Sequence, residues 1–312
     1  MPERYFVRSR RGAYAALALL TVLWGANWAV MKFALELAHP VMLNVHRTLI
    51  AALIVFAVLV WQRRPLLPPS WIAVIVTGIF QTTLNFGSTT MALAGGGAGR
   101  TSVLVFTMPF WTLLLAWPVL HERVKGGQWF AVAFALMGLV LVVEPWNWQG
   151  DLAPKLWAVS SGFGWAAGTV ATKFFQRRRQ FDPLNFLAWQ MLVGVVPLAL
   201  LPVLFSFPAS QWTATYVLLL LYIAGISTAV GFLLWMAVLR FLPAGTASLN
   251  MFAIPVIALV SSMLIFDERL TTAEWLGIGC IGVGLAILSL DVVRATRRGE
   301  PVPAVPTPLD GG

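Results

Sequence analysis

The third apolar stretch of this sequence carries four uncharged polar side chains at helical spacing. Gln81, Asn85, Ser88 and Thr89 stand at positions i, i+4, i+7 and i+8, so a helix would carry them on one face. Polar groups that face lipid are unfavourable, and this face is therefore expected to look inward. It either packs against another helix or lines a wet cavity. Four hydrogen-bonding groups without charge favour the cavity, because they could bind a zwitterion or another polar solute.

Small, polar and aromatic residues share a face in two other apolar stretches, residues 12–33 and 154–175. Small residues let helix backbones approach closely, and interior tryptophans add large amphipathic surfaces. Filling of gaps between helices is the competing interpretation. Together these features favour a partly apolar pocket that suits amino acids with apolar or aromatic side chains. The candidate substrate-binding residues are Trp24, Asn27, His46, Gln81, Asn85, Thr89, Trp165, Thr169, Trp189, Gln190 and Asn250.

Two prolines, Pro109 and Pro255, interrupt apolar stretches at matching places and are candidates for gating kinks. A proline inside a helix removes one backbone hydrogen bond and bends the helix. A static kink is the alternative interpretation. No catalytic residue and no metal ligand is predicted.

Ionisable residues are rare inside the apolar stretches. Arg47 lies about two turns into residues 41–61, and a charge at the bilayer centre costs about 3 kcal/mol or more. Arg47 therefore reaches the interface, bonds backbone carbonyls or faces a cavity, where it could contact a substrate carboxylate. The acidic residues fall in loops or at helix ends, so His46 is the one group near the interior that could titrate near neutral pH.

The composition places the whole chain in a membrane. Of 312 residues, 59% are hydrophobic and 11% are charged, whereas soluble domains carry about 25% charged residues. A spanning helix needs about 20 apolar residues, and barrel strands would be shorter and would alternate. A single cysteine, Cys280, excludes a disulfide framework, and no cofactor is expected. The segments predicted to span the bilayer as helices are residues 12–33, 41–61, 71–93, 100–120, 127–144, 154–175, 184–206, 212–239, 245–266 and 273–291.

The basic residues predict the orientation of the chain. With the N-terminus inside, the outer segments hold only Arg100, Lys155 and Arg269, and most other basic residues lie on the cytoplasmic side. This bias explains the net charge of +9 without a nucleic-acid partner. Both termini are expected in the cytoplasm of a bacterial cell, with the protein in its inner membrane.

The two halves of the chain repeat each other. The Trp-to-Lys-Phe spacing of Trp24–Phe33 recurs in Trp165–Phe174, and residues 40–47 match residues 183–190. From Ala98 and Ala244 onward, one constant offset (244 − 98 = 146) pairs both prolines, both Glu-Arg pairs and two tryptophans. Five helices per repeat is an odd number, so the second copy must cross the membrane inverted, as in many secondary transporters. A duplication kept for packing alone is the alternative. The expected segments are residues 1–11 (cytoplasmic), 12–150 (first repeat), 151–293 (second repeat) and 294–312 (a disordered cytoplasmic tail).

The module that closes each half carries a family resemblance. In the second half it reads Ala253-Ile-Pro255, Asp267-Glu-Arg-Leu270, Trp275-Leu-Gly277 and Gly282-Val-Gly284. With ten helices and a Trp-Gly-Ala-Asn start, the sequence resembles EamA-type proteins of the drug/metabolite transporter superfamily over residues 12–291. Within this superfamily, the sequence resembles most the aromatic amino-acid exporters called YddG-like, by general likeness and by its many interior tryptophans. The resemblance implies export of amino acids or other small metabolites.

We therefore expect a secondary transporter that exports aromatic or other apolar amino acids, or related metabolites, by alternating access. The fifth and tenth helices should be peripheral supports. Without a mid-membrane carboxylate, the simplest carrier is a uniporter, and we expect a monomer in contact with lipid. Alternatives are a multidrug or nucleoside exporter driven by proton antiport, and a membrane scaffold or receptor. An intramembrane enzyme is disfavoured because the sequence lacks a His-Glu-x-x-His motif and a pair of membrane aspartates.

Overall fold

The computed structural model describes residues 9–122, 126–144, 146, 152–239 and 253–297, and within them all regular structure is helical. Several spans are built from more than one helical piece. The first half contains α1 (Arg10–Ala34), α2 (Pro40–Trp61), a span made of α3 (Trp71–Thr77), η1 (Gly78–Leu84) and α4 (Asn85–Gly95), a span made of α5 (Ala98–Val105) and α6 (Met108–Leu120), and α7 (Gly126–Val143). The second half contains α8 (Leu152–Gln176), α9 (Pro183–Leu204), a span made of α10 (Ala214–Leu220), η2 (Leu221–Val230) and α11 (Gly231–Leu239), then α13 (Ala253–Phe266) and α14 (Thr272–Arg297).

Most of these spans are long and apolar enough to cross a bilayer. In the described part of the chain, eight helical spans meet that standard by length and composition, and α13 is a shorter apolar helix. α8 has 25 residues but holds more polar and small ones. The prediction of an all-helical polytopic membrane protein is confirmed.

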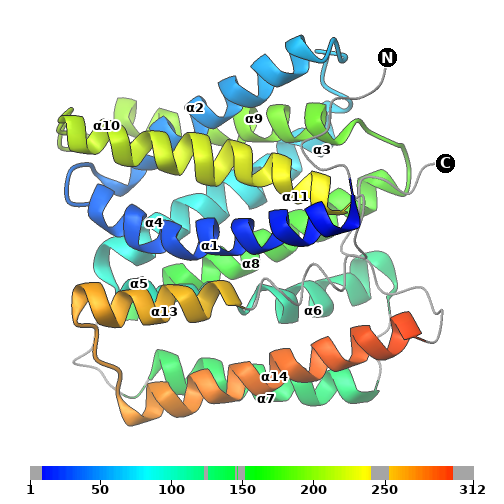
Figure 1. Cartoon of the computed structure of the whole chain (residues 1–312), viewed down its shortest axis with the longest axis vertical. Helices are drawn as coiled ribbons and strands as arrows, with labels where there is room; N and C mark the ends of the chain where they lie inside the picture. The colour runs from blue at the N-terminus through cyan, green and yellow to red at the C-terminus, as the bar shows by residue number, and fades with distance from the viewer. Residues whose placement is uncertain (1–8, 123–125, 145, 147–151, 240–252, 298–312) are drawn as a thin grey trace.

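The two halves run in opposite senses through the bundle. α1 begins and α14 ends at the same end of the molecule, on the right in Figure 1, and this end is called the terminal end below. α8 begins at the other end, called the opposite end, where Lys155 in its first turn approaches Glu274 in the first turn of α14. The fold is therefore a pair of inverted five-span repeats.

The core joins both repeats, with one helix pair at its edge. Buried Trp28 and Leu104 of the first half share one apolar cluster with Ile223 and Ile254 of the second. α7 and α14 pack along each other at one side of the bundle, below the other helices in Figure 1. The fifth and tenth helices are therefore peripheral, as expected from the sequence.

Irregular helix geometry occurs at matching places in the two halves. The third span of each half contains a π-helical segment, η1 and η2, and such segments occur frequently at functional sites. The fourth span is broken after Val105, so Pro109 is the second residue of α6 and does not lie inside a continuous helix. This break follows from the missing N–H of proline, which cannot bond the carbonyl of Val105. Pro255 lies in the first turn of α13 as described, and residues 240–252 before it lie outside the described part.

Candidate functional site

The π-helical segment η1 is held against α9 of the other repeat. Thr82 donates a hydrogen bond from Oγ1 to the carbonyl of Gln190 (3.4 Å), and Thr83 donates one to the carbonyl of Gly194 (2.5 Å). The backbone hydrogen bonds of a π-helix span one residue more than those of an α-helix, and this changes the direction of the side chains that follow. η1 thereby sets the orientation of Gln81 and Asn85, which belong to the predicted polar stripe.

Three of the predicted polar residues form one chain of hydrogen bonds across both repeats. Gln190 of α9 donates from Nε2 to Oε1 of Gln81 (2.8 Å), and Gln81 donates from its own Nε2 to Oγ1 of Thr169 on α8 (3.1 Å). Thr169 in turn donates to the carbonyl of Trp165 (2.8 Å). Gly168 leaves room for Gln81, because a Cβ there would lie 2.3 Å from Cγ of Gln81. The sequence indicated these residues separately, and the structure brings them together.

Asn85 and Thr89 make a second cluster one turn further along the same span. Asn85 donates from Nδ2 to the carbonyl and to Oγ of Ser161, both at 2.9 Å, and Thr89 Oγ1 lies 2.6 Å from Ser161 Oγ. Asn85, Thr89 and Ser161 are 4%, 6% and 0% exposed. Gly164 admits the backbone of this span, because a Cβ there would lie 2.9 Å from the Phe80 carbonyl oxygen. The stripe faces inward as predicted, and here it joins α4 to α8.

Two predicted tryptophans lie beside one phenylalanine of α11. Trp165 stacks on Phe232 with ring centroids 6.3 Å apart, and Trp24 meets the same ring edge-on at 5.9 Å. The indole N–H of Trp24 donates to the carbonyl of Ser227 in η2 (2.8 Å). Phe232 was not predicted from the sequence, where it is one of many aromatic residues in an apolar segment.

The remaining candidates lie apart from these clusters. His46 Nδ1 lies 2.8 Å from the hydroxyl of Tyr216, and Trp189 donates to the carbonyl of Leu66 near the terminal end (2.8 Å). Asn27 is 6% exposed, and its Oδ1 has no hydrogen-bond partner among the described residues. Asn250 lies outside the described residues.

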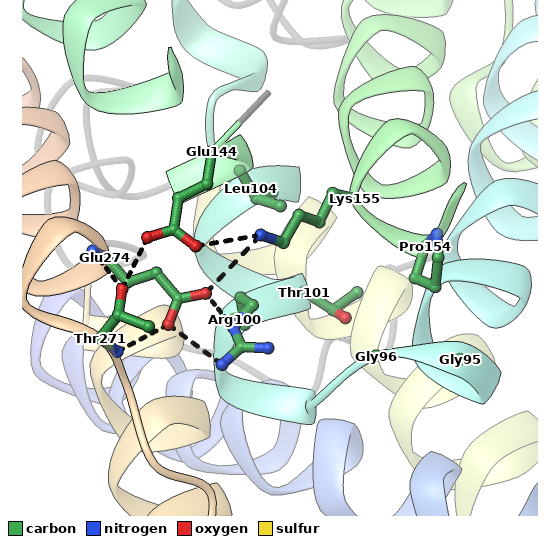
Figure 2. A pocket seen from close by; sticks show the side chains of 10 residues that line it. All are labelled: Gly95, Gly96, Arg100, Thr101, Leu104, Glu144, Pro154, Lys155, Thr271 and Glu274. Carbon is green, nitrogen blue, oxygen red and sulfur yellow. Dashed lines mark hydrogen bonds and ion pairs between the residues drawn. The ribbon is translucent and has the colours of Figure 1, made fainter. Parts of the chain in front are cut away.

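A cavity of about 210 Å³ lies at the opposite end and is lined by charges of both signs (Figure 2). Arg100 binds Glu274 through Nε at 2.6 Å and Nη2 at 3.0 Å, and Lys155 lies 3.7 Å from Glu144 and 4.0 Å from Glu274. Thr271 donates from Oγ1 to Glu144 and from its backbone N–H to Glu274, both at 2.9 Å. This network ties α5, α7, α8 and α14 together. The sequence placed these charges at helix ends but did not indicate that they meet.

A repeat-related pair of glutamates has different partners in the two halves. Glu268 accepts hydrogen bonds from the backbone N–H groups of Gly99 (3.0 Å) and Arg100 (3.1 Å), and so caps the first turn of α5 at the opposite end. Its repeat equivalent, Glu122, pairs with Lys173 of α8 and with Arg177, which follows α8, near the terminal end. The two ends of the bundle are therefore held by different contacts.

The clusters bring together polar and aromatic groups from both repeats. Buried amide and hydroxyl groups from both repeats supply donors and acceptors without charge, and the rings of Trp24, Trp165 and Phe232 supply apolar surface. Aromatic surface with a few convergent polar groups is the usual composition of a small-molecule site.

Comparison with known proteins adds independent information. Residues 11–144 and 153–290 each match the EamA-like transporter family. A Bacillus subtilis (strain 168) protein named "Uncharacterized transporter YvbV" is 28% identical over 293 residues, which cover 93% of each chain. An Escherichia coli (strain K12) protein named "Probable amino-acid metabolite efflux pump" is 28% identical over 293 residues, covering 89% of this chain and 95% of that protein. A solved structure, titled only "Crystal structure of protein", shares the fold with a TM-score of 0.61 at 20% identity, covering 89% of this chain and 97% of that one.

Proposed function

This chain belongs to the EamA-like transporter family, and we propose that it exports amino acids, preferably aromatic or other apolar ones, or closely related metabolites. One observation carries the proposal: the hydrogen-bond chain Gln190–Gln81–Thr169 joins the two repeats with buried neutral groups, beside the aromatic group of Trp24, Trp165 and Phe232. The efflux-pump name of a relative that matches 89% of this chain supports the same class of solute.

The proposed roles divide between polar and aromatic residues. Gln81, Asn85, Thr89, Thr169 and Gln190 supply hydrogen bonds to the polar end of the solute. Trp24 and Trp165 receive its apolar side chain. Because these polar groups now bond one another between helices, binding requires that solute atoms replace some of those bonds. Such an exchange couples occupancy of the site to the packing of α4 and α8, as alternating access demands.

The two ends of the bundle are the proposed gates. The network of Arg100, Glu274, Lys155 and Glu144, together with the Glu268 cap on α5, links helices of both repeats at the opposite end. We assign this end to the outside of a bacterial inner membrane, with both chain termini in the cytoplasm, from the distribution of basic residues. Outward opening then requires that these ion pairs separate. Pro109 and Pro255, each near the start of a helix, are the proposed bending points.

Solute counterflow in proteoliposomes tests the proposal. Vesicles loaded with unlabelled L-phenylalanine should accumulate labelled L-phenylalanine, whereas vesicles without protein should not. A panel that includes L-leucine, L-serine and a nucleoside then ranks the solutes. Exchange of the nucleoside alone would reject amino-acid export and support the nucleoside exporter.

A further inference from the structure

Arg47 is a buried cation whose partners are all neutral in the described part of the chain. It is 7% exposed, and its Nε donates to Oγ1 of Thr228 (2.9 Å) while Nη1 donates to the sulphur of Met31 (3.4 Å). Its guanidinium carbon lies 4.2 Å from the centre of the Phe86 ring. No carboxylate among the described residues pairs with it, so a full charge is held in the membrane without a counter-ion. Such a charge is unfavourable unless a negative group compensates it for part of the time.

The repeat shows that the contact made by Arg47 does not itself require a charge. In the alignment of residues 40–47 with 183–190, Gln190 is the counterpart of Arg47. Each donates to the π-helical segment of the other half: Arg47 to Thr228 in η2, and Gln190 to Gln81 in η1. A neutral amide makes this cross-repeat bond in one half, so the charge in the other half calls for a separate explanation.

Unpaired oxygens occur on α2, which carries Arg47, and on α1, which carries its partner Met31. Asn44 and Thr48 flank Arg47 on α2, and both are 0% exposed, with Oδ1 and Oγ1 lacking any hydrogen-bond partner among the described residues. On α1, Asn27 precedes Met31 by one turn, so the two share a face, and its Oδ1 is likewise unpaired. Buried polar atoms without partners are uncommon and require an explanation. Here three acceptor atoms accompany one uncompensated cation.

We propose that Arg47 binds the carboxylate of the transported solute and that the unpaired oxygens of Asn27, Asn44 and Thr48 accept hydrogen bonds from its ammonium group. The planar guanidinium matches a carboxylate through two parallel N–H donors. Thioether sulphur is a weak acceptor, so the bond to Met31 is readily exchanged for one to the solute. This inference rests on the proposed function and narrows it: the site selects α-amino acids, and amines without a carboxylate are excluded.

The test compares three probes on the purified full-length protein: L-phenylalanine, L-phenylalanine amide, which lacks the carboxylate, and 3-phenylpropionate, which lacks the ammonium group. Thermal stability is measured as each probe is titrated, and counterflow of labelled L-phenylalanine is measured in parallel. The wild-type protein should be stabilised by both carboxylates, more by the zwitterion, and not by the amide. R47Q should lose at least tenfold in apparent affinity for both carboxylates.

The matched control is R178Q. Arg178 also holds its guanidinium 4.2 Å from a phenylalanine ring, that of Phe174, but it is exposed at the end of α8. R178Q should respond to the probes like the wild type. If R47Q does not fold, R47K replaces it: the lysine keeps the charge without the planar fork, and a severalfold weaker response to carboxylates is expected.

The outcomes separate this inference from the proposed function. If L-phenylalanine and 3-phenylpropionate stabilise R47Q or R47K as much as the wild type, the inference is overturned. It is also overturned if neither carboxylate stabilises the wild-type protein. A wild-type protein that exchanges no amino acid, yet is stabilised by 3-phenylpropionate through Arg47, would overturn the proposed function and leave the carboxylate site standing.

Discussion

Gln190 of α9 donates a hydrogen bond of 2.8 Å to Gln81 of η1, and this bond links the second repeat to the first inside the bundle. Gln81 in turn donates a hydrogen bond to Thr169 of α8. Removal of one member leaves buried partners unpaired, which costs about 1–3 kcal/mol per group. The two repeats are thus joined here by a few neutral hydrogen bonds.

Gln81→Leu should reduce amino-acid counterflow about tenfold or more with near-normal expression. The substitution removes hydrogen bonds worth about 1–3 kcal/mol, and about 1.4 kcal/mol corresponds to a factor of ten. Gln62→Leu is the control, since Gln62 is exposed at the end of α2. The rate is measured in proteoliposomes of equal protein content. Asn85→Leu should behave like Gln81→Leu. Wild-type rates in both variants would mean that the stripe serves packing alone.

Trp165→Ala should weaken exchange of apolar amino acids more than that of small polar ones. Trp165 stacks on Phe232, and its loss removes apolar surface while the nearby hydrogen bonds of Thr169 remain available. The measurement is the ratio of counterflow rates for L-phenylalanine and L-serine in the variant and in the wild type. An equal loss for both solutes would assign Trp165 a structural role.

Gly164→Ala should destabilise the solubilised protein by about 1–3 kcal/mol, the usual cost of overpacking. Its new Cβ would lie 2.9 Å from the carbonyl oxygen of Phe80 and 3.0 Å from the backbone nitrogen of Asn85, neither of which is a flexible side chain. Gly279→Ala is the control, because nothing lies within 4 Å of a Cβ at that position. There the alanine should stabilise α14 by about 0.5–1 kcal/mol. Equal melting temperatures for the two variants would contradict this close approach.

Residue patterns predict the helices and the inward faces, but not the partners. Hydropathy and the repeat indicate the spans, and the spacing of Gln81, Asn85 and Thr89 indicates one buried face. The π-helical segments η1 and η2 depend on how spans pack on one another, and no local signal in the sequence specifies an extra residue per turn. The contact of Trp24 with Phe232 is equally non-local, as are those of Thr271 with Glu144 and of Arg100 with Glu274, because each joins residues far apart in the chain.

The orientation of the chain can be tested with single cysteines in a Cys280→Ala background. The side chain of Arg269 is 86% exposed and lies at the opposite end, so Arg269→Cys should be labelled from outside the cell by an impermeant maleimide. Arg179→Cys, exposed at the terminal end, should be labelled only after the membrane is permeabilised. A reporter fused after residue 298 should be active in the cytoplasm. Equal labelling of both cysteines from outside would contradict the positive-inside assignment.

Energy coupling provides the last prediction, and it follows from where ionisable groups lie. Glu274 is 1% exposed and Glu144 is 8% exposed, but both belong to the ion-pair network with Arg100 and Lys155 at the opposite end of the bundle. His46, within α2, bonds the Tyr216 hydroxyl at 2.8 Å and is the remaining candidate for carrying a proton near neutral pH.

Because the acidic residues fall in loops or at helix ends, we expect that a pH gradient imposed on proteoliposomes drives no uphill accumulation of L-phenylalanine. Counterflow should continue without the gradient. His46→Gln should exchange substrate within about twofold of the wild-type rate, because the glutamine amide can still bond the Tyr216 hydroxyl and leaves no buried partner unpaired. Uphill transport that disappears in His46→Gln would show proton coupling through this histidine. Uphill transport that persists in His46→Gln would reject the uniporter. Glu144 and Glu274 would then be the next residues to substitute, and their ion pairs with Lys155 and Arg100 would have to separate when a proton binds.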